Sequence, residues 1–275
     1  MPIAISSTLA TRPYWLAYLT EAGGAACFIM GSGLATLLAE HPASPVAQAL
    51  LAHAGARRAV IGALVALVLC IMAYSPLGQR SGAHFNPAVT LGFWHLGRIS
   101  TSDALTYVLA QVLGAAAGAK LLHLTLGSWL EHPAVHSLLT QPKPVPNGTV
   151  VAWVAEFIIA GGLMAVLLSA LNSQTLHKAT GALAAALLAF YIIVEAPYSG
   201  MSLNPARSLG TALAAGDFQG LWIYWTAPPL AMWLVAVGWK YRLGHSLARA
   251  TQPGPAPVHH GAAHPLHYPV LHAAD

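Results

Sequence analysis

The chain alternates long apolar stretches with short polar connections, and six of the stretches are long enough to cross a bilayer. A helix needs about 20 apolar residues to span the hydrocarbon core, within a range of roughly 17–25. Backbone polar groups find no water in lipid, so a stretch of this kind is expected to be a helix with internal hydrogen bonds. The six stretches are Tyr14–Leu38, Ala59–Leu77, Ala104–Gly127, Val150–Leu171, Gly181–Pro197 and Leu221–Lys240.

Two further apolar stretches are too short to span, and both begin with the tripeptide Asn-Pro-Ala. They cover residues 86–97 and 204–215. Asn is a good N-cap and Pro is well placed at the first helical position, so each stretch predicts a half-length helix that begins at its Asn. The alternative is an ordinary loop followed by a surface helix, which the internal repeat of the chain disfavours.

The two short segments repeat one another. Gly82–Gly92 and Gly200–Gly210 are related by a constant offset of 118 residues and are identical at six positions. A second match precedes each motif, because Glu21 and Glu156 each stand shortly before a Gly-Gly pair in an apolar stretch. Each half therefore holds three spans and one half-span. Since three is odd, the second half must enter the membrane inverted, and half-helices at matching positions of an inverted repeat point to the functional site.

The repeat divides the chain into two halves, a connection and a tail. The first repeat is residues 1–130, the connecting loop is 131–149, the second repeat is 150–243, and 244–275 is a Pro- and His-rich tail. The composition of the tail predicts a flexible cytoplasmic segment. Metal binding by its histidines is the alternative, but their spacing is irregular and no cysteine accompanies them.

Composition and charge support a membrane protein. Charged residues make up 7% of the chain, against about 25% in soluble domains, and this excludes an ordinary soluble enzyme, a disordered chain and a coiled coil. The net charge of +4 is too small and too scattered to predict nucleic-acid binding. Cys27 and Cys70 lie in apolar stretches and are expected to be small buried thiols. If both termini are cytoplasmic, seven basic residues lie inside and three outside, which favours that orientation. The seven are Arg12, Arg80, Arg98, Lys178, Lys240, Arg242 and Arg249, and the three are Arg57, Arg58 and Lys143.

The paired motifs resemble those of the aquaporin or major intrinsic protein family. The first comprises Asn86, Pro87 and Ala88, and the second comprises Asn204, Pro205, Ala206 and, unlike the first, a following Arg207. The resemblance covers about residues 14–242 and implies an aquaporin-like fold in which two half-helices meet head to head at mid-membrane. It further implies a homotetramer in the lipid bilayer, with one pore per subunit for water and small uncharged solutes and no cofactor.

The predicted half-helices give this resemblance a physical basis. Each helix N-terminus carries roughly half a positive charge, so two such ends at one place oppose the passage of cations and protons. Asn86 and Asn204 would each offer an amide N–H to a passing oxygen. A bare arginine in a membrane is costly, so Arg207 should face a watery cavity, and the resemblance places it in the pore constriction.

The spacing from the two motifs, together with the resemblance, assigns the rest of the selectivity filter to Ala66, Ile192 and Met201, beside Arg207. These residues give a wide aliphatic constriction, similar to that of relatives that pass boric acid or other small uncharged solutes. Other positions resemble the water-type subfamily, namely Ser208, Ala212, Tyr224 and Trp225. The scaffold thus resembles a water channel, whereas the filter resembles a broader one.

Three carboxylates in the apolar stretches leave a second function open. The resemblance implies that Glu21 and Glu156 brace the half-helix loops, with His84 packed in the first loop. The alternative is a proton relay of Glu21, Glu156 and Glu195 in a proton-coupled secondary transporter of a small neutral solute. Glu195 pairs with Arg207 or faces water. No catalytic cluster or phosphate loop indicates an enzyme, and the expected location is a plasma membrane or bacterial inner membrane.

Overall fold

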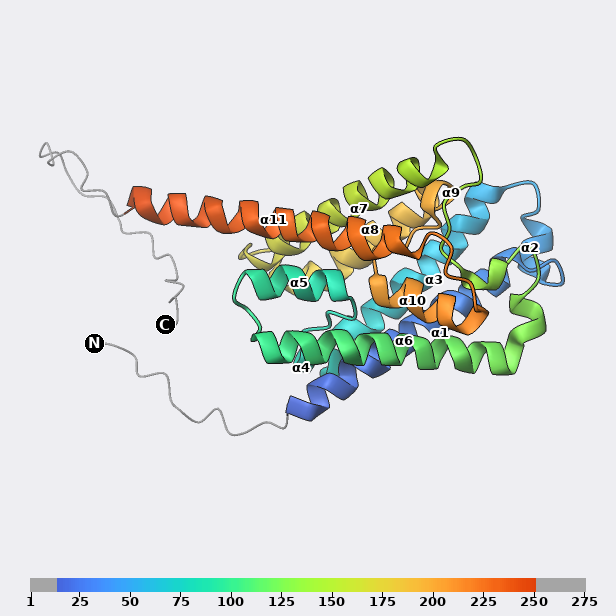
Figure 1. Ribbon diagram of the computed structural model, residues 1–275, viewed down its shortest axis with the longest axis horizontal. Helices are drawn as coiled ribbons and strands as arrows, with labels where there is room; N and C mark the ends of the chain where they lie inside the picture. Colours follow the sequence, from blue (N-terminus) through green and yellow to red (C-terminus); the bar gives the residue numbers. More distant parts are fainter. Residues whose placement is uncertain (1–13, 251–275) are drawn as a thin grey trace, which may run out of the picture. The chain divides into compact units, whose positions relative to one another are not determined.

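The computed structural model describes residues 14–250, and their regular structure is entirely helical. Six helices are long and apolar enough to cross a membrane, counting α8 together with the short η2 that precedes it. These helices are α1 (Tyr14–Glu40), α3 (Ala54–Tyr74), α6 (Thr101–Leu130), α7 (Gly148–Leu171), α8 (Thr180–Val194) and α11 (Leu221–Ala250). The half-length helices are α5 (Pro87–His95) and α10 (Pro205–Ala215), and the short segments are α2 (Pro45–Ala49), α4 (Pro76–Ser81), η1 (His136–Leu138), η2 (His177–Ala179) and α9 (Ala196–Ser199). The predicted fold class, six spanning helices plus two half-helices, is confirmed (Figure 1).

Two spanning helices end earlier than expected, and proline is the reason in both. α3 ends at Tyr74 because Ser75 takes an extended backbone and begins α4, where its hydroxyl accepts a hydrogen bond from the Gly78 N–H at 2.9 Å. The residue before a proline disfavours the helical region, and Pro76 follows Ser75. α8 likewise ends at Val194 because Pro197 belongs to α9.

Other boundaries also differ from expectation, among them the end of the first half-helix and the start of the tail. The first half-helix ends at His95, two residues before the predicted end at residue 97. α11 continues to Ala250, so residues 244–250 of the predicted tail are helical. The remaining tail residues, 251–275, with their histidines, lie outside the described part of the chain.

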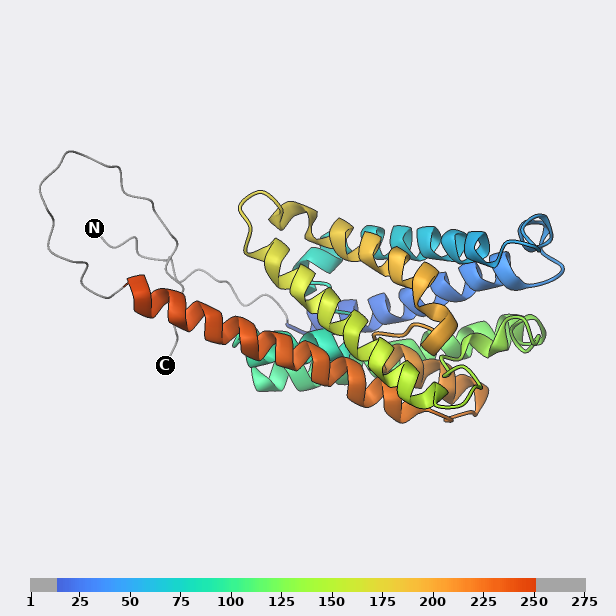
Figure 2. The same cartoon turned by 90° about the horizontal axis from the view of Figure 1, so that it is seen from above.

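Small residues bring neighbouring helices into close contact. A Cβ atom on Gly114 of α6 would lie 2.0 Å from the carbonyl oxygen of Ala22 in α1. One on Gly62 of α3 would lie 2.9 Å from the carbonyl oxygen of Ala189 in α8, and these two helices run side by side in Figure 2. In lipid, such close backbone approach supplies the packing that water-driven burial supplies in soluble proteins.

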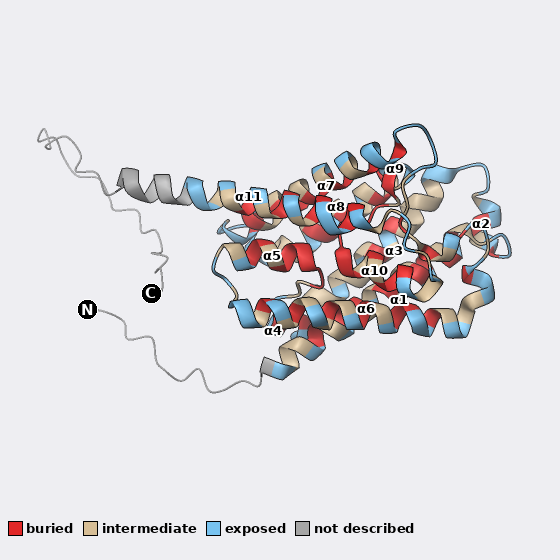
Figure 3. Ribbon diagram, viewed as in Figure 1, coloured by how far each residue is buried: buried red, intermediate tan, exposed pale blue. Residues whose placement is uncertain are grey.

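Burial separates the half-helices from the spanning helices. Most residues of α5 and α10 are buried, and much of their ribbon is coloured as buried in Figure 3. The spanning helices instead carry many large apolar side chains that are exposed. The half-helices therefore lie inside the bundle. The prediction of two buried thiols was wrong, because Cys27 is exposed and Cys70 is half-buried.

Candidate functional site

Each half-helix begins at the asparagine of its motif, as the sequence predicted. The side-chain oxygen of Asn86 accepts a hydrogen bond from the Ala88 N–H at 2.8 Å. That of Asn204 accepts from the Ala206 N–H at 3.0 Å and from the Arg207 N–H at 3.3 Å. A proline follows each cap at the first helical position, where a missing N–H costs nothing.

The two caps are hydrogen-bonded crosswise. Asn86 Nδ2 donates to the carbonyl oxygen of Leu203 at 2.8 Å, and Asn204 Nδ2 donates to that of Phe85 at 2.8 Å. The N-terminal ends of α5 and α10 therefore meet, which brings their partial positive charges together. A side-chain amide has two N–H groups, so each asparagine keeps one N–H beyond this contact.

Glu21 of α1 holds the loop that precedes Asn86. Its Oε1 accepts hydrogen bonds from Ser81 Oγ at 2.7 Å and the His84 N–H at 3.1 Å. Its Oε2 accepts from the Phe85 N–H at 2.6 Å and from Gln111 Nε2 at 2.7 Å. The fully buried carboxylate thus receives four donors, two of them from the loop backbone.

Glu156 of α7 holds the second loop in the same way. Its Oε1 accepts hydrogen bonds from Ser199 Oγ at 2.7 Å and the Ser202 N–H at 2.6 Å, and its Oε2 accepts from the Leu203 N–H at 2.8 Å. The serine and the two N–H donors lie 118 residues after their counterparts in the first loop. The sequence repeat is therefore also a repeat of contacts.

These contacts hold strained backbone in place. Ala83 and Phe85 have φ of 51° and 48°, and their counterparts Met201 and Leu203 have φ of 50° and 60°. Non-glycine residues in this left-handed region cost on the order of 1–3 kcal/mol each and persist only where the surroundings enforce them. The glutamate carboxylates supply that enforcement at the N–H of Phe85 and of Leu203.

Two tyrosines support the same loops, and the sequence analysis assigned this role to neither of them, although it singled out Tyr224. Tyr107 donates its hydroxyl proton to the carbonyl oxygen of Ser81 at 2.8 Å, and Tyr224 donates to that of Ser199. Both tyrosines are buried, and each lies beyond its motif at a nearly equal distance along the chain, which is the signal that could have found them. His84 is hydrogen-bonded to Thr90 and stacked on Phe93 with ring centroids 4.8 Å apart.

Two cavities lie within the bundle, one beside the paired asparagines and the other beside the arginine. We call them the asparagine-side cavity, about 550 Å³, which Asn86, Asn204 and His84 help to line, and the arginine-side cavity, about 300 Å³, which Arg207 helps to line. Four helices contribute residues spaced four apart, as expected for one face of a helix. They are Phe28, Ser32, Thr36 and Glu40 on α1, Ile61, Val65, Leu69 and Ala73 on α3, Leu163, Leu167 and Leu171 on α7, and Ala184, Leu188 and Ile192 on α8.

The structure brings three of the four expected filter residues to the arginine-side cavity. Ile192, Met201 and Arg207 line it, whereas Ala66 lines neither cavity and its neighbour Val65 takes that place. Ala66 was reached by counting back from Asn86 through the irregular connection 75–82, where spacing does not fix helix register. Adjacent helical residues point about 100° apart, so a one-residue error turns the side chain out of the lining.

Arg207 keeps a donor for the cavity. Its Nη1 is buried and has no hydrogen-bond partner among the described residues. Glu195 is 4% exposed, neither of its carboxylate oxygens has a hydrogen-bond partner there, and it forms no ion pair with Arg207 in the described part of the chain. Neither expectation for Glu195, pairing with the arginine or facing water, matches this placement.

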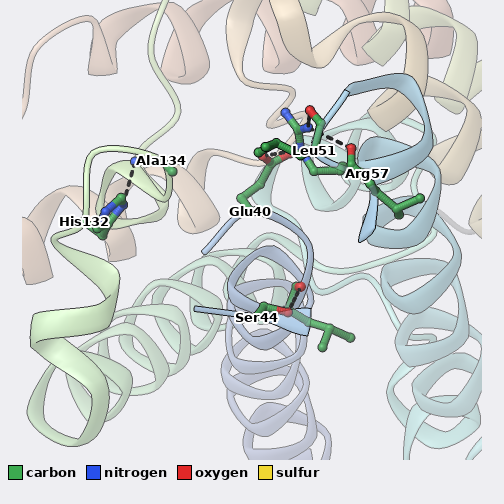
Figure 4. Close-up of polar contacts among 8 residues, drawn as sticks. Glu40, Ser44, Leu51, Arg57, His132 and Ala134 are labelled. Atoms are coloured by element: carbon green, nitrogen blue, oxygen red, sulfur yellow. Dashed lines mark hydrogen bonds and ion pairs between the residues drawn. The ribbon is translucent and has the colours of Figure 1, made fainter. Parts of the chain in front are cut away.

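The rim of the arginine-side cavity is held by an ion pair. Arg57 Nε lies 2.8 Å from Glu40 Oε2, and Arg57 Nη1 donates to the carbonyl oxygen of Leu51 at 2.7 Å. Figure 4 shows these contacts beside Ser44, whose hydroxyl donates to the carbonyl oxygen of Leu38. The contacts tie the connection between α1 and α3 to the first turn of α3.

Comparisons with known proteins agree with this architecture. The family model described as "Major intrinsic protein" matches residues 8–237. The chain is 36% identical over 179 residues to "Aquaporin NIP1-1" of Zea mays, covering 64% of this chain and 60% of that protein. It is 35% identical over 180 residues to "Nodulin-26" of Glycine max, covering 64% and 62%.

The matched region therefore spans less than two thirds of the length of these relatives. The X-ray structure of the aquaglyceroporin from Plasmodium falciparum superimposes with a TM-score of 0.69 at 18% identity, covering 86% of this chain and 99% of that one, which shows a shared fold. The family match extends over nearly the whole described bundle and both asparagine motifs, and this chain therefore belongs to the major intrinsic protein family of membrane channels.

Proposed function

We propose that the chain is a passive channel for water and small uncharged solutes that excludes ions and protons. The observation that carries this proposal is the crosswise bonding of Asn86 and Asn204 at the adjoining N-termini of two half-helices. The fields of both helix ends oppose cations and protons at that point. The spare amide N–H of each asparagine would donate a hydrogen bond to the oxygen of a passing water molecule. This hydrogen bond would reorient the water and so interrupt the chain of hydrogen bonds along which a proton could move.

The proposed filter consists of Val65, Ile192, Met201 and Arg207. Three of these side chains are aliphatic or thioether groups, and the unpartnered Nη1 of Arg207 supplies a donor beside them. Weak binding on an apolar wall lets a neutral solute leave quickly. The fixed cationic guanidinium repels cations, and uncharged molecules with an acceptor oxygen fit this chemistry.

The alternative, a proton-coupled transporter, is less well supported. A proton relay needs carboxylates that exchange protons with a water path. Glu21 and Glu156 instead accept four and three hydrogen bonds from the loops and the neighbouring helices. Their hydrogen-bonding capacity is taken up by the structure that positions Asn86 and Asn204. This argues for a structural role in a channel rather than for a carrier.

The setting of the channel is also a proposal. We infer a homotetramer in a plasma membrane or bacterial inner membrane. We also infer cytoplasmic termini, because the lysine and arginine residues on that side would outnumber those on the outer side by seven to three. The arginine-side cavity then opens to the outside.

Uptake of labelled glycerol into proteoliposomes under an imposed proton gradient tests the proposed function. A passive channel brings the internal concentration to the external one and no further, at any gradient. Accumulation above the external concentration, dependent on the gradient, would instead establish the transporter.

A further inference from the structure

Glu195 is a buried charged residue to which the proposed function gives no role. Its side chain is 4% exposed, and neither carboxylate oxygen has a hydrogen-bond partner among the described residues. It directly follows the last residue of α8, where the partial negative charge of a helix C-terminus disfavours a carboxylate. A costly carboxylate inside a membrane bundle points to a function.

The internal repeat links Glu195 to Arg207. Under the offset of 118 residues, Glu195 corresponds to Leu77 and Arg207 corresponds to Val89. The second half therefore carries two opposite charges where the first half carries two apolar residues. Both departures from the repeat occur in the half that supplies the arginine of the proposed filter, which indicates that the two charges act together.

The two charges are close to one another without direct contact. Glu195 lies within electrostatic range of Arg207 and of Glu156, but it forms no direct ion pair with the arginine in the part of the chain that the structure describes. Glu156 already accepts three hydrogen bonds from α9 and the loop that follows it. Glu195 is therefore the neighbouring carboxylate whose two oxygens are both free to accept.

The atoms without partners on the two residues are complementary. Glu195 offers two acceptor oxygens and Arg207 offers the donor Nη1, and all three atoms are buried. Buried polar atoms in proteins nearly always have a partner, either in the protein or in an ordered water. Complementary groups too far apart for a direct hydrogen bond are commonly bridged by a water molecule. One water can donate to the carboxylate and accept from Nη1.

The chain places this bridge behind the wall of the arginine-side cavity. Ile192 before Glu195, and Ala196 and Pro197 after it, all line the cavity, whereas Glu195 does not. Arg207 does line it, so its guanidinium can contact a solute on one side and the bridging water on the other. Nη1 carries two N–H groups, so the bridge leaves one of them for a solute.

We propose that Glu195 is a positioning residue that holds the guanidinium of Arg207 in the filter through one bridging water molecule. The inference rests on the proposed function, and it adds a residue and a water site to the filter. Arginine has a long side chain with several rotatable bonds, so it stays across the cavity only while its far side is held. Without the bridge, the guanidinium can move aside and larger solutes can pass.

Substitutions at Glu195 separate the acceptor from the charge. Glu195→Leu removes the acceptor at similar size, whereas Glu195→Gln keeps an acceptor oxygen for the water. Glycerol and water permeability are measured in the same proteoliposomes. Glu195→Leu should raise the glycerol-to-water ratio about threefold, equivalent to about 0.7 kcal/mol, in the same direction as Arg207→Ala. Glu195→Gln should keep the native ratio. Glu195→Met is a second apolar variant with the same expected rise, should the leucine variant fail to fold.

A double variant distinguishes positioning from a general structural effect. Glu195→Leu combined with Arg207→Ala should give the ratio of Arg207→Ala alone, because coupled residues are not additive. Glu40→Leu is the matched control, since it removes a carboxylate that lines the same cavity and pairs with Arg57, and it should keep the native ratio.

Three results would overturn the inference. They are a native ratio in the apolar Glu195 variants, a rise in Glu195→Gln as large as in Glu195→Leu, and additive effects in the double variant. Absence of water conduction by the native protein would instead remove the proposed function itself.

Discussion

Replacing Glu156 of α7 by glutamine exchanges one carboxylate oxygen for an NH₂ group and should destabilise the second loop strongly. The carboxylate accepts hydrogen bonds from Ser199, Ser202 and Leu203 at 2.6–2.8 Å. A glutamine side chain offers one oxygen, which can keep the two donors that now share Oε1. Its NH₂ group would then face the Leu203 N–H, donor against donor, at a residue held at φ of 60°.

The expected cost follows from these contacts. A buried donor left without a partner costs about 1–3 kcal/mol, and each of the two remaining bonds loses about 1 kcal/mol when its acceptor is no longer charged. The total is on the order of 3–5 kcal/mol. At about 2–4 °C per kcal/mol for a chain of this size, the melting temperature should fall by roughly 10 °C. Glu21→Gln should give a similar fall, because it leaves the Phe85 N–H in the same position.

Thermal unfolding of purified protein in detergent, followed by intrinsic fluorescence, measures this effect. Glu40→Gln is the matched control, because Glu40 is partly exposed at the cavity rim and pairs with Arg57. Exposed ion pairs contribute about 0–1 kcal/mol, so the control should melt within about 4 °C of the native protein. If Glu156→Gln melts like this control and conducts water at the native rate, the bracing argument is incorrect.

Three further predictions concern the arginine-side cavity and Glu195. Arg207→Ala should admit solutes larger than those the native channel passes and weaken cation exclusion, and unchanged selectivity in flux assays would contradict its placement. Val65→Phe combined with Ile192→His should narrow the pore until water passes and glycerol does not, whereas Ala66→Phe should leave glycerol flux at the native level, since Ala66 lines neither cavity. Glu195→Gln should keep the native permeability and at least the native melting temperature, because the carboxylate is buried without a hydrogen-bond partner in the described structure; loss of transport in this variant would revive the proton-relay alternative.

The sequence predicted the parts of the fold that composition and repetition determine. The lengths of the apolar stretches predicted the six spans, and the two Asn-Pro pairs predicted both half-helices with their N-caps. The glutamate that stands before a Gly-Gly pair in each half correctly anticipated that Glu21 and Glu156 have equivalent places in the two repeats, and the structure adds the donors from which they accept hydrogen bonds. These features are either local or repeated within the chain, so they can be predicted from one amino-acid sequence.

Helix register was harder to predict than helix position. Ala66 was chosen by counting across the break at Ser75–Pro76, where α3 ends and α4 begins. The lining follows a pattern that the sequence shows, since Ile61, Val65, Leu69 and Ala73 are spaced four residues apart.

Stopped-flow light scattering of proteoliposomes tests the central claim most directly. An impermeant osmolyte is applied first, followed by glycerol, urea and boric acid in turn, with protein-free vesicles as the reference. The account predicts rapid shrinkage with the impermeant osmolyte and rapid shrinkage followed by reswelling with the small solutes. Shrinkage at the rate of protein-free vesicles would contradict the assignment as a channel.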